Sequence, residues 1–242
     1  MRKLNHIDNE TIRKQWDISA EKRFKEISTG TDLSYRNVLM PYFEASLKRA
    51  KPNQVLDAGC GVGFIAKLAS SHCSYVAGVD LSPKSIKIAQ DRNCGENVEF
   101  ICSSIETFNP KTKFDFIVAN MTLMDCVDHK AFITSCSNLL NKGGKFVATI
   151  TNPFYWPRYW QYEKKAWFTY NQEIHVEAEF STSSTGLAGF QTIHTHRPLS
   201  SYVKAICEAQ LTMSDLSELS GAVQKRSVHS KYPRYIALEG IK

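Results

Sequence analysis

The stretch VLDAGCGVG, residues 55–63, decides the fold of this chain. It starts as a short apolar run, ends in three glycines at alternate positions, and leads directly into the helix-like segment GFIAKLASSH. Glycines at a strand-to-helix turn let the backbone approach a ligand closely, because no Cβ stands in the way. The next apolar run ends at Asp80, 17 residues after Gly63. A carboxylate at the end of a neighbouring strand is placed to accept hydrogen bonds from ribose hydroxyls.

Strand-like and helix-like patterns alternate on the carboxyl side of this turn. Strands are predicted at 54–57, 74–82, 97–104, 114–121 and 145–151, with a helix after most of them. Strands that are apolar nearly throughout and alternate with helices are typical of a parallel sheet covered by helices on both faces. The sequence therefore predicts an α/β fold and a single domain over residues 1–242.

Further segments surround the predicted core, residues 53–151. Residues 1–50 carry helical apolar stripes and predict a helical N-terminal cap. Residues 152–196 are rich in aromatics and contain a predicted hairpin of EIHVEAEF and GFQTIHTH. An insertion of that length is often a functional lid over a binding site. Residues 197–242 complete the sheet with the strand-like runs LTMSDLSEL and PRYIALEGI.

Composition excludes several classes of function. The chain has 242 residues, of which 43% are hydrophobic and 22% charged, and it contains no apolar run near the roughly 20 residues of a membrane span. The N-terminal residues lack the apolar core of a secretory signal. Seven scattered cysteines form no CxxC pair, which argues against zinc knuckles and favours a cytoplasmic, reducing location. The net charge of +6 is spread along the chain, which indicates solvated surface charge rather than a nucleic-acid-binding stripe.

Four motifs together resemble a known family. The spacing D-x-G-x-G-x-G differs from the G-x-G-x-x-G of dinucleotide-binding proteins, and no phosphate-cradling G-x-x-x-x-G-K-[ST] loop occurs. DAGCGVG (57–63), VDLS (79–82), FDFIVA (114–119) and KGGKF (142–146) resemble the successive motifs of class I S-adenosylmethionine-dependent methyltransferases, of the small-molecule (methyltransferase domain 11/25-like) type. The resemblance implies a Rossmann-like, seven-stranded, mostly parallel sheet whose last strand is antiparallel. It also implies S-adenosylmethionine as cofactor and S-adenosylhomocysteine as product.

The resemblance carries over a set of cofactor-binding positions. The glycine turn would face the methionine half of the cofactor, Asp80 the ribose and Leu81 the adenine. Family members often place an acidic residue near the adenine amine, where this chain has serines instead, so Ser104 takes that place here. The full predicted set is Asp57, Gly59, Cys60, Gly61, Gly63, Asp80, Leu81, Ser104, Ile105, Asn120 and Met121.

The acceptor side is predicted from two segments, the aromatic run after 151 and the run HTHRPL at 194–199. The second resembles a segment of small-molecule methyltransferases in which a His-Arg pair faces the pocket, which implies His196 as base or positioning group and Arg197 as an anion clamp. The predicted acceptor-binding residues are Tyr155, Tyr159, Trp160, Arg197, Asp125 and His129. His194 and His196 share a strand face, but no third ligand stands nearby, so no metal is predicted.

The tetrad Asn152-Pro153-Phe154-Tyr155 is similar to the Asn-Pro-Pro-aromatic motif that holds a nucleobase amine in amino-methyltransferases. In those enzymes the motif follows the fourth strand, whereas here it leaves the fifth, so we interpret it as the hinge into an aromatic lid. The predicted function is transfer of a methyl group to an oxygen or nitrogen of a small molecule by in-line displacement. A methyltransferase for nucleic acid or protein and a non-catalytic cofactor-binding module stay open, as do the acceptor's identity and the oligomeric state.

Overall fold

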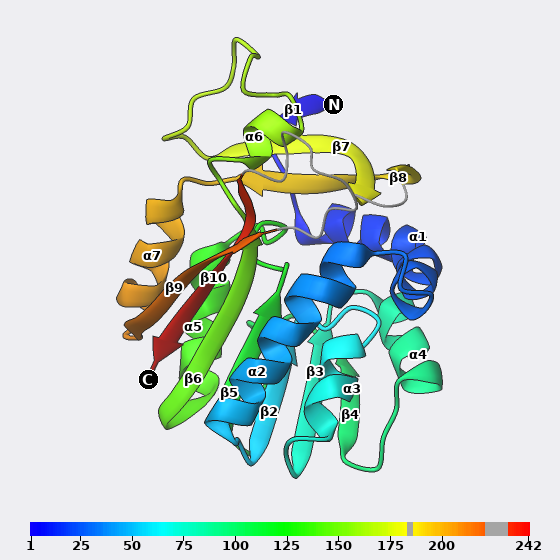
Figure 1. Ribbon diagram of the computed structural model, residues 1–242, viewed down its shortest axis with the longest axis vertical. Helices are drawn as coiled ribbons and strands as arrows, with labels where there is room; N and C mark the ends of the chain where they lie inside the picture. Colours follow the sequence, from blue (N-terminus) through cyan, green and yellow to red (C-terminus); the bar gives the residue numbers. More distant parts are fainter. Residues whose placement is uncertain (183–185, 221–231) are drawn as a thin grey trace.

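The computed structural model describes residues 1–182, 186–220 and 232–242, and its centre is a seven-stranded sheet (Figure 1). In chain order its strands are β2 (Gln54–Ala58), β3 (Tyr75–Asp80), β4 (Val98–Cys102), β5 (Phe114–Asn120), β6 (Leu140–Thr151), β9 (Thr212–Ser220) and β10 (Pro233–Ile241). Across the sheet the order is β4-β3-β2-β5-β6-β10-β9. The pairs from β4 to β6 are parallel, and β10 runs antiparallel to both of its neighbours. The predicted mostly parallel sheet with an antiparallel last strand is confirmed.

Helices cover both faces of this sheet, as the apolar strands predict. On one face α2 (Met40–Ala50), α3 (Phe64–Ser70) and α4 (Pro83–Arg92) pack on the strands, and Val55 is buried there. On the other face α5 (His129–Leu139) and α7 (Leu199–Glu208) pack against Leu56. Successive strand residues thus enter opposite cores, which explains why these strands are apolar at nearly every position.

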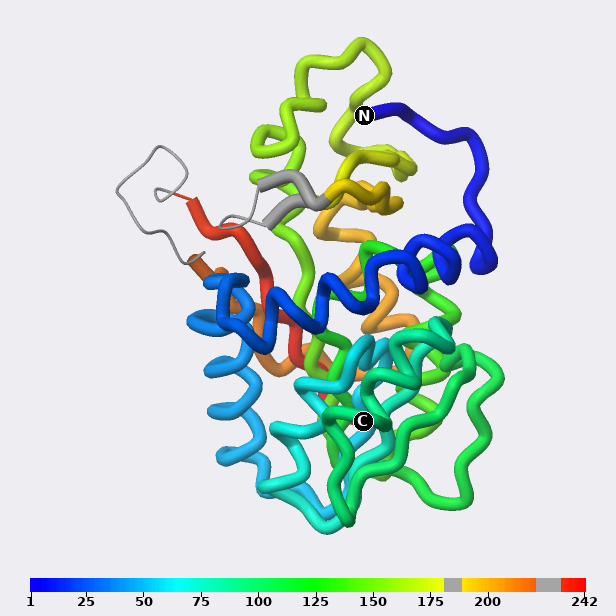
Figure 2. Tube along the Cα trace, turned by 90° about the vertical axis from the view of Figure 1, so that its right-hand side faces the viewer, coloured from blue at the N-terminus to red at the C-terminus, as the bar shows by residue number. Residues whose placement is uncertain are grey.

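The N-terminal region is helical, as predicted, and crosses the upper edge of the sheet. α1 (Asn9–Ser28) runs between the sheet and the segment above it (Figure 2). A π-helical turn, η1 (Tyr35–Leu39), leads into α2, and Pro41 lies in the first turn of α2.

The segment after β6 forms a short helix, α6 (Trp156–Tyr159), and then a hairpin of β7 (Ile174–Thr182) and β8 (Gly186–His196). The predicted hairpin is confirmed. A third strand was not predicted: β1 (Arg2–Leu4) pairs antiparallel with β7. The sequence RKL is too short and too charged to show strand periodicity, and its pairing is set by the exposed edge of β7. The division of the chain into cap, core, lid and end of sheet stays a prediction.

Candidate active site

A cavity lies at the carboxyl ends of the parallel strands, between the sheet, α1 and the hairpin. Residues that follow β2, β3 and β5 form its floor, where ligands of open α/β sheets bind. Trp16 of α1, the aromatic segment after β6, and Thr192 and His194 of β8 form the opposite walls. The cavity therefore runs from the glycine turn to the aromatic segment.

Glycine is needed at the three positions of the turn for different structural reasons. All three have positive φ, between +51° and +86°. A Cβ on Gly59 would lie 2.4 Å from Thr122 Cγ2, and one on Gly63 would lie 2.6 Å from Phe100 Cζ. A Cβ on Gly61 would meet no atom within 4 Å, and Gly61 lines the cavity. Gly59 and Gly63 are thus required by packing, whereas Gly61 keeps the cavity wall open to a ligand.

Asp80 joins the turn to the end of β3. Its Oδ2 accepts a hydrogen bond of 2.8 Å from the Gly61 N–H, and its Oδ1 accepts one of 2.8 Å from the Ser82 N–H. Burial raises the pKa of this carboxyl, and the two backbone donors oppose that shift. Each oxygen keeps a further lone pair for a ligand, since a carboxylate accepts about four hydrogen bonds.

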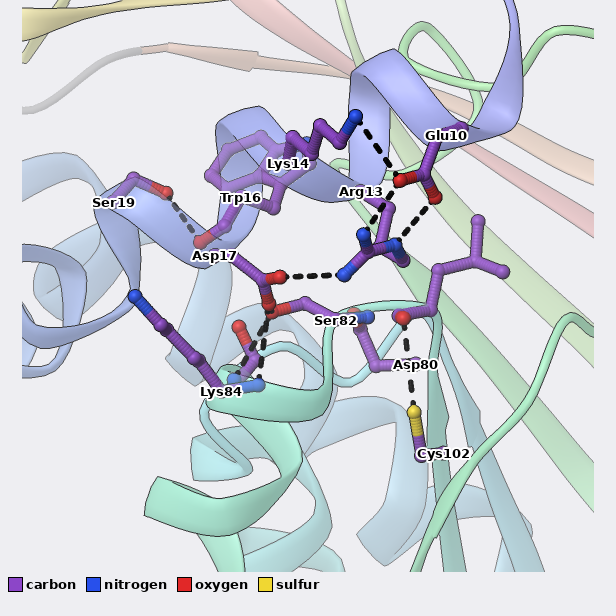
Figure 3. Close-up of polar contacts among 12 residues, drawn as sticks. Glu10, Arg13, Lys14, Trp16, Asp17, Ser19, Asp80, Ser82, Lys84 and Cys102 are labelled. Carbon is purple, nitrogen blue, oxygen red and sulfur yellow. Dashed lines mark hydrogen bonds and ion pairs between the residues drawn. The ribbon is translucent and has the colours of Figure 1, made fainter.

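Helix α1 is attached to this edge through Asp17 (Figure 3). One carboxylate oxygen of Asp17 accepts from Ser82 Oγ at 2.6 Å and from the Lys84 N–H at 3.2 Å, at the start of α4. The other oxygen pairs with Arg13 at 2.7 Å. Because Arg13 and Trp16 of the same helix line the cavity, Asp17 fixes one wall of the site. No sequence pattern indicates this contact between Asp17 and Ser82, because the two residues lie 65 positions apart.

Asp57 lies beneath the turn and does not line the cavity. It is buried, and neither of its oxygens has a hydrogen-bond partner among the described residues. Burial raises the pKa of Asp57 to about 7, the nearby Ala66 N–H opposes the shift in part, and the charge of Asp80 adds to it. Ionisation of Asp57 therefore lowers the free energy of unfolding.

The other predicted cofactor-binding residues divide into two groups. Cavity-lining members, besides Gly59, Gly61 and Asp80, are Cys60, Leu81, Ile105, Asn120 and Met121. Ser104 and Gly63 lie outside the lining, and Ser103 takes the place of Ser104 in the wall. Ser104 instead shares a hydrogen bond of 2.9 Å with Thr107 in the turn after β4. Asn120 is oriented by Thr149, whose hydroxyl donates to Asn120 Oδ1 at 2.9 Å.

Of the predicted acceptor-binding residues, Tyr159, Trp160 and Asp125 line the cavity, whereas Tyr155 and His129 do not. Tyr155 stacks behind Tyr159, with ring centroids 5.6 Å apart. His129 is buried at the start of α5, where its Nε2 lies 3.0 Å from Ser201 Oγ and burial lowers its pKa to about 4. Asp125 faces the cavity, and burial raises the pKa of its carboxyl well above the usual range.

Arg197 was predicted to line the cavity but lies outside it, where it holds other parts of the fold together. Its side chain is fully buried and its Nε pairs with Glu173 at 2.5 Å. Its other nitrogens donate to backbone carbonyls of the loop after β5, namely those of Leu123, Cys126 and Val127. Arg197 therefore holds the loop that presents Asp125 to the cavity.

The two histidines of β8 differ in their position relative to the cavity: His194 lines it and His196 does not. His196 lies outside the cavity, where its Nε2 is 3.0 Å from the Tyr170 carbonyl oxygen and its ring packs among Tyr162, Phe168 and Tyr170. His194 lines the cavity, with its ring centroid 5.6 Å from that of Trp160. Burial lowers the pKa of His194 to about 3, with smaller contributions from His196 and Arg197, so its imidazole is neutral at pH 7.

Several wall residues were missed from the sequence. They come from α1, the hairpin and β10: Arg13, Trp16, Arg23, Phe180, Thr192, Arg234 and Tyr235. Tyr35, which the sequence analysis places in the helical N-terminal cap, also lines the cavity. Among the described residues no group of three or more His, Cys, Asp or Glu side chains is arranged to hold a metal ion. In the same part of the chain, no helix is both long and apolar enough to cross a membrane.

The sheet order, the glycine turn and the cavity at the strand ends define a protein of the Rossmann-like class I methyltransferase fold. The family model described as "Methyltransferase domain" matches residues 56–148. Residues 56–148 are thus similar to a methyltransferase domain, and the fold is that of class I S-adenosylmethionine-dependent methyltransferases.

Curated relatives match the same part of the chain. The chain is 31% identical over 121 residues to a ubiquinone biosynthesis O-methyltransferase of Coxiella burnetii, which covers 48% of the chain and 51% of that protein. A protein of the same name from Idiomarina loihiensis is 31% identical over 103 residues, 41% of the chain and 42% of that protein. The chain thus spans about half the length of the curated relatives it matches.

The fold is also similar to that of solved structures at low sequence identity. The 1,6-didemethyltoxoflavin-N1-methyltransferase of Burkholderia thailandensis, with bound 1,6-didemethyltoxoflavin and S-adenosylhomocysteine, has a TM-score of 0.61 at 16% identity and covers 99% of this chain and 92% of its own. An S-adenosylmethionine-dependent methyltransferase of Mesorhizobium loti has a TM-score of 0.59 at 16% identity and covers 82% and 96%.

Proposed function

We propose that this chain transfers a methyl group from S-adenosylmethionine to an oxygen or nitrogen of a small-molecule acceptor. The observation that carries the proposal is the continuous cavity, which reaches from Gly61 and Asp80 at the sheet edge to Trp156, Trp160 and His194. A cofactor site and an aromatic chamber that share one cavity can bring a methyl donor and its acceptor together.

The residues at the sheet edge fit the cofactor. The open space beside Gly61 admits a ligand next to the backbone, and Asp80 retains acceptor capacity for ribose hydroxyls. Leu81 and Ile105 supply apolar wall for the adenine ring. When bound, the cofactor supplies an electrophilic methyl group on a positively charged sulfur. The wall residues of α1, Trp16 among them, exclude water from that end of the cavity.

At the other end, three aromatic side chains, Trp156, Tyr159 and Trp160, form the acceptor chamber with His194. In-line displacement requires the acceptor's lone pair to point at the methyl carbon, so alignment is the main task of these residues. The neutral imidazole of His194 can accept a hydrogen bond from a hydroxyl or amine and orient its lone pair. We therefore assign to His194 the positioning role that the sequence predicted for His196.

Asp125 is the proton acceptor that we propose for acceptors that arrive protonated. Its carboxyl lines the cavity, and its raised pKa makes it a stronger base than an ordinary aspartate. An Asp125→Asn variant should bind S-adenosylhomocysteine normally and lose turnover with hydroxyl acceptors.

The names of similar proteins support a small acceptor and leave the atom open. The relatives that match the cofactor half are named O-methyltransferases, whereas the Burkholderia neighbour is named an N-methyltransferase. The sequence contains no concentrated basic stripe, so it does not favour nucleic acid as the methyl acceptor.

Isothermal titration with S-adenosylhomocysteine is the first test, and we expect one site per chain. Labelled S-adenosylmethionine is then offered with small aromatic alcohols and amines, tRNA and denatured protein, and the methylated product is identified by mass spectrometry. Failure to bind S-adenosylhomocysteine would contradict the proposed methyl transfer. Methylation of only tRNA or protein would show that the acceptor is a macromolecule rather than a small molecule.

A further inference from the structure

Arg234 is a buried cation in the cavity wall. The residue is 4% exposed, and its Nε atom has no hydrogen-bond partner among the residues that the structure describes. Its guanidinium carbon lies 5.2 Å from the ring centroid of Tyr159, and Tyr155 is a second close neighbour. Neither neighbour is a carboxylate, so the described residues supply Arg234 with no counter-charge in the cavity.

The other arginines that line the cavity are paired. Arg13 forms ion pairs with Glu10 and Asp17, and Arg23 forms ion pairs with Glu26 and Asp32. No carboxylate of the described residues lies within ion-pair distance of Arg234. Taking a charge out of water is unfavourable unless it is paired and hydrogen-bonded. A guanidinium in this position indicates that a ligand supplies the missing anion.

A β-bulge points Arg234 at the cavity. The pairing of β10 with β9 shifts register between Pro233 and Tyr235, so Arg234 has no partner of its own on β9. Successive side chains of a regular strand point to opposite faces, yet Arg234 and Tyr235 both line the cavity. Bulges often occur beside active sites, where they redirect one side chain.

Asn152 holds this bulge in place. Its side-chain Nδ2 donates to the Pro233 carbonyl at 3.0 Å, and its backbone N–H donates to the Arg234 carbonyl at 2.8 Å. Its Oδ1 accepts from the Phe154 N–H at 3.0 Å, which starts the aromatic segment. The asparagine of the Asn-Pro-Phe-Tyr tetrad thus orients the strand that carries Arg234 instead of facing a nucleobase.

We propose that Arg234 recognises an oxyanion, a carboxylate or phosphate group, on the methyl acceptor. The inference rests on the proposed function and specifies its substrate class. The planar guanidinium fork matches these groups with two parallel hydrogen bonds. Trp156, Tyr159 and Trp160 supply flat apolar surface beside it. The acceptor is therefore a small molecule with a flat or apolar body and an anionic group.

The first test uses stability without any ligand. Arg234→Met removes a charge that the protein does not pair, so its melting temperature should shift upward relative to wild type. Arg197→Met is the matched control, because Arg197 is equally buried but donates to three carbonyls and pairs with Glu173, and its melting temperature should shift downward. A downward shift of Arg234→Met as large as that of the control would assign Arg234 a structural role and overturn the proposal.

The second test measures binding to the protein saturated with S-adenosylhomocysteine, using the fluorescence of the chamber tryptophans. The probes are benzoate, phenyl phosphate and uncharged benzamide. Wild type should bind one of the anions at least tenfold more tightly than benzamide, and the preferred anion distinguishes carboxylate from phosphate. Arg234→Gln should lose the preference while its affinities for benzamide and S-adenosylhomocysteine stay within twofold of wild type. Asn152→Ala should reduce the preference in part, as expected of a positioning residue.

The outcomes separate this inference from the proposed function. Equal binding of the three probes to wild type, no binding of either anion, or an unchanged preference in Arg234→Gln would overturn the inference. A tenfold loss of S-adenosylhomocysteine affinity in Arg234→Gln would also overturn it, because Arg234 would then hold the cofactor's carboxylate. Wild type that fails to bind S-adenosylhomocysteine yet prefers the anions would instead contradict the proposed function.

Discussion

Of the two glycines that line the cavity, Gly59 and Gly61, only Gly61 has open space at the position of a Cβ. We expect Gly61→Leu to weaken S-adenosylhomocysteine binding at least tenfold, because the new side chain extends into the cavity where a Cβ has no neighbour within 4 Å. The positive φ of +51° also strains the folded backbone of the variant, which should lower the free energy of unfolding by about 1–2 kcal/mol. Isothermal titration measures the first effect and urea denaturation the second.

Gly143 supplies the control for this experiment. It has a φ of +79°, its Cβ position is also open, and it lies outside the cavity lining. Gly143→Leu should lose similar stability, since the backbone strain is similar, and keep wild-type affinity for S-adenosylhomocysteine. Equal affinities in the two variants would show that Gly61 does not border the cofactor.

Asp57 predicts an unusual dependence of stability on pH. Its folded pKa of about 7 lies above the unfolded value of 3.8, so the folded state holds the proton more tightly. The contribution of this group to stability is complete below pH 3.8 and is lost as pH rises through 7. From pH 5 to pH 8 the loss amounts to about 3 kcal/mol, at 1.36 kcal/mol per pKa unit.

Asp57→Asn removes this titration while keeping the size of the side chain. We expect the difference in unfolding free energy, variant minus wild type, to increase by about 3 kcal/mol between pH 5 and pH 8. Taking the difference cancels the opposite slopes of His129 and His194, whose lowered pKa values reduce stability as pH falls below 6.5. Urea denaturation at several pH values measures it, and a difference independent of pH would contradict a raised pKa.

At the scale of elements, Asp17 connects α1 to the start of α4 at the edge of the cofactor site. Asp17→Ala removes acceptors from Ser82 Oγ and the Lys84 N–H and should cost about 1–2 kcal/mol of stability, as the loss of a helix cap does. Affinity for S-adenosylhomocysteine should fall severalfold, because Arg13 and Trp16 leave their positions. Amide hydrogen exchange of α1 and titration measure both effects.

Glu10→Ala is the matched change on the same helix. Glu10 pairs with Arg13 at the exposed surface, where solvent screens the ion pair, so stability and affinity should change little. If Asp17→Ala behaves like Glu10→Ala, the contact between α1 and α4 does not hold the site together.

Elements were predictable from sequence where their signal is local. The alternation of apolar strands and helices, the glycine turn and Asp80 all depend on residues close together in the chain, and they predicted the sheet and its edge. β1 was missed because three residues carry no periodicity and its partner lies about 170 residues away. His196 was expected in the cavity but lies outside it, because alternation specifies a strand face but not which position on that face is covered by Tyr162 and Phe168.

At the scale of the whole molecule, the candidate site depends on contacts between distant segments that no local pattern reports. Arg234 reaches the cavity through a bulge between two strands, and the bulge is fixed by Asn152, which directly follows a third strand, β6. Arg197 shows the reverse case. Its sequence context resembles that of a pocket residue, but its guanidinium donates hydrogen bonds to backbone carbonyls of the loop after β5. The sequence predicts which region forms the acceptor side, while tertiary packing determines which arginine faces it.

Arg197 also connects the two sheets, which gives the last prediction. It lies at the end of the hairpin, pairs with Glu173, and donates to the carbonyls of Leu123, Cys126 and Val127 beside the main sheet. Arg197→Met leaves these carbonyls without a donor and should cost about 3–5 kcal/mol, measured by urea denaturation. Arg197→Lys keeps the charge but has no planar fork, so it should recover less than half of the loss. Complete recovery by lysine would show that charge alone, rather than the three directed hydrogen bonds, holds the hairpin to the sheet.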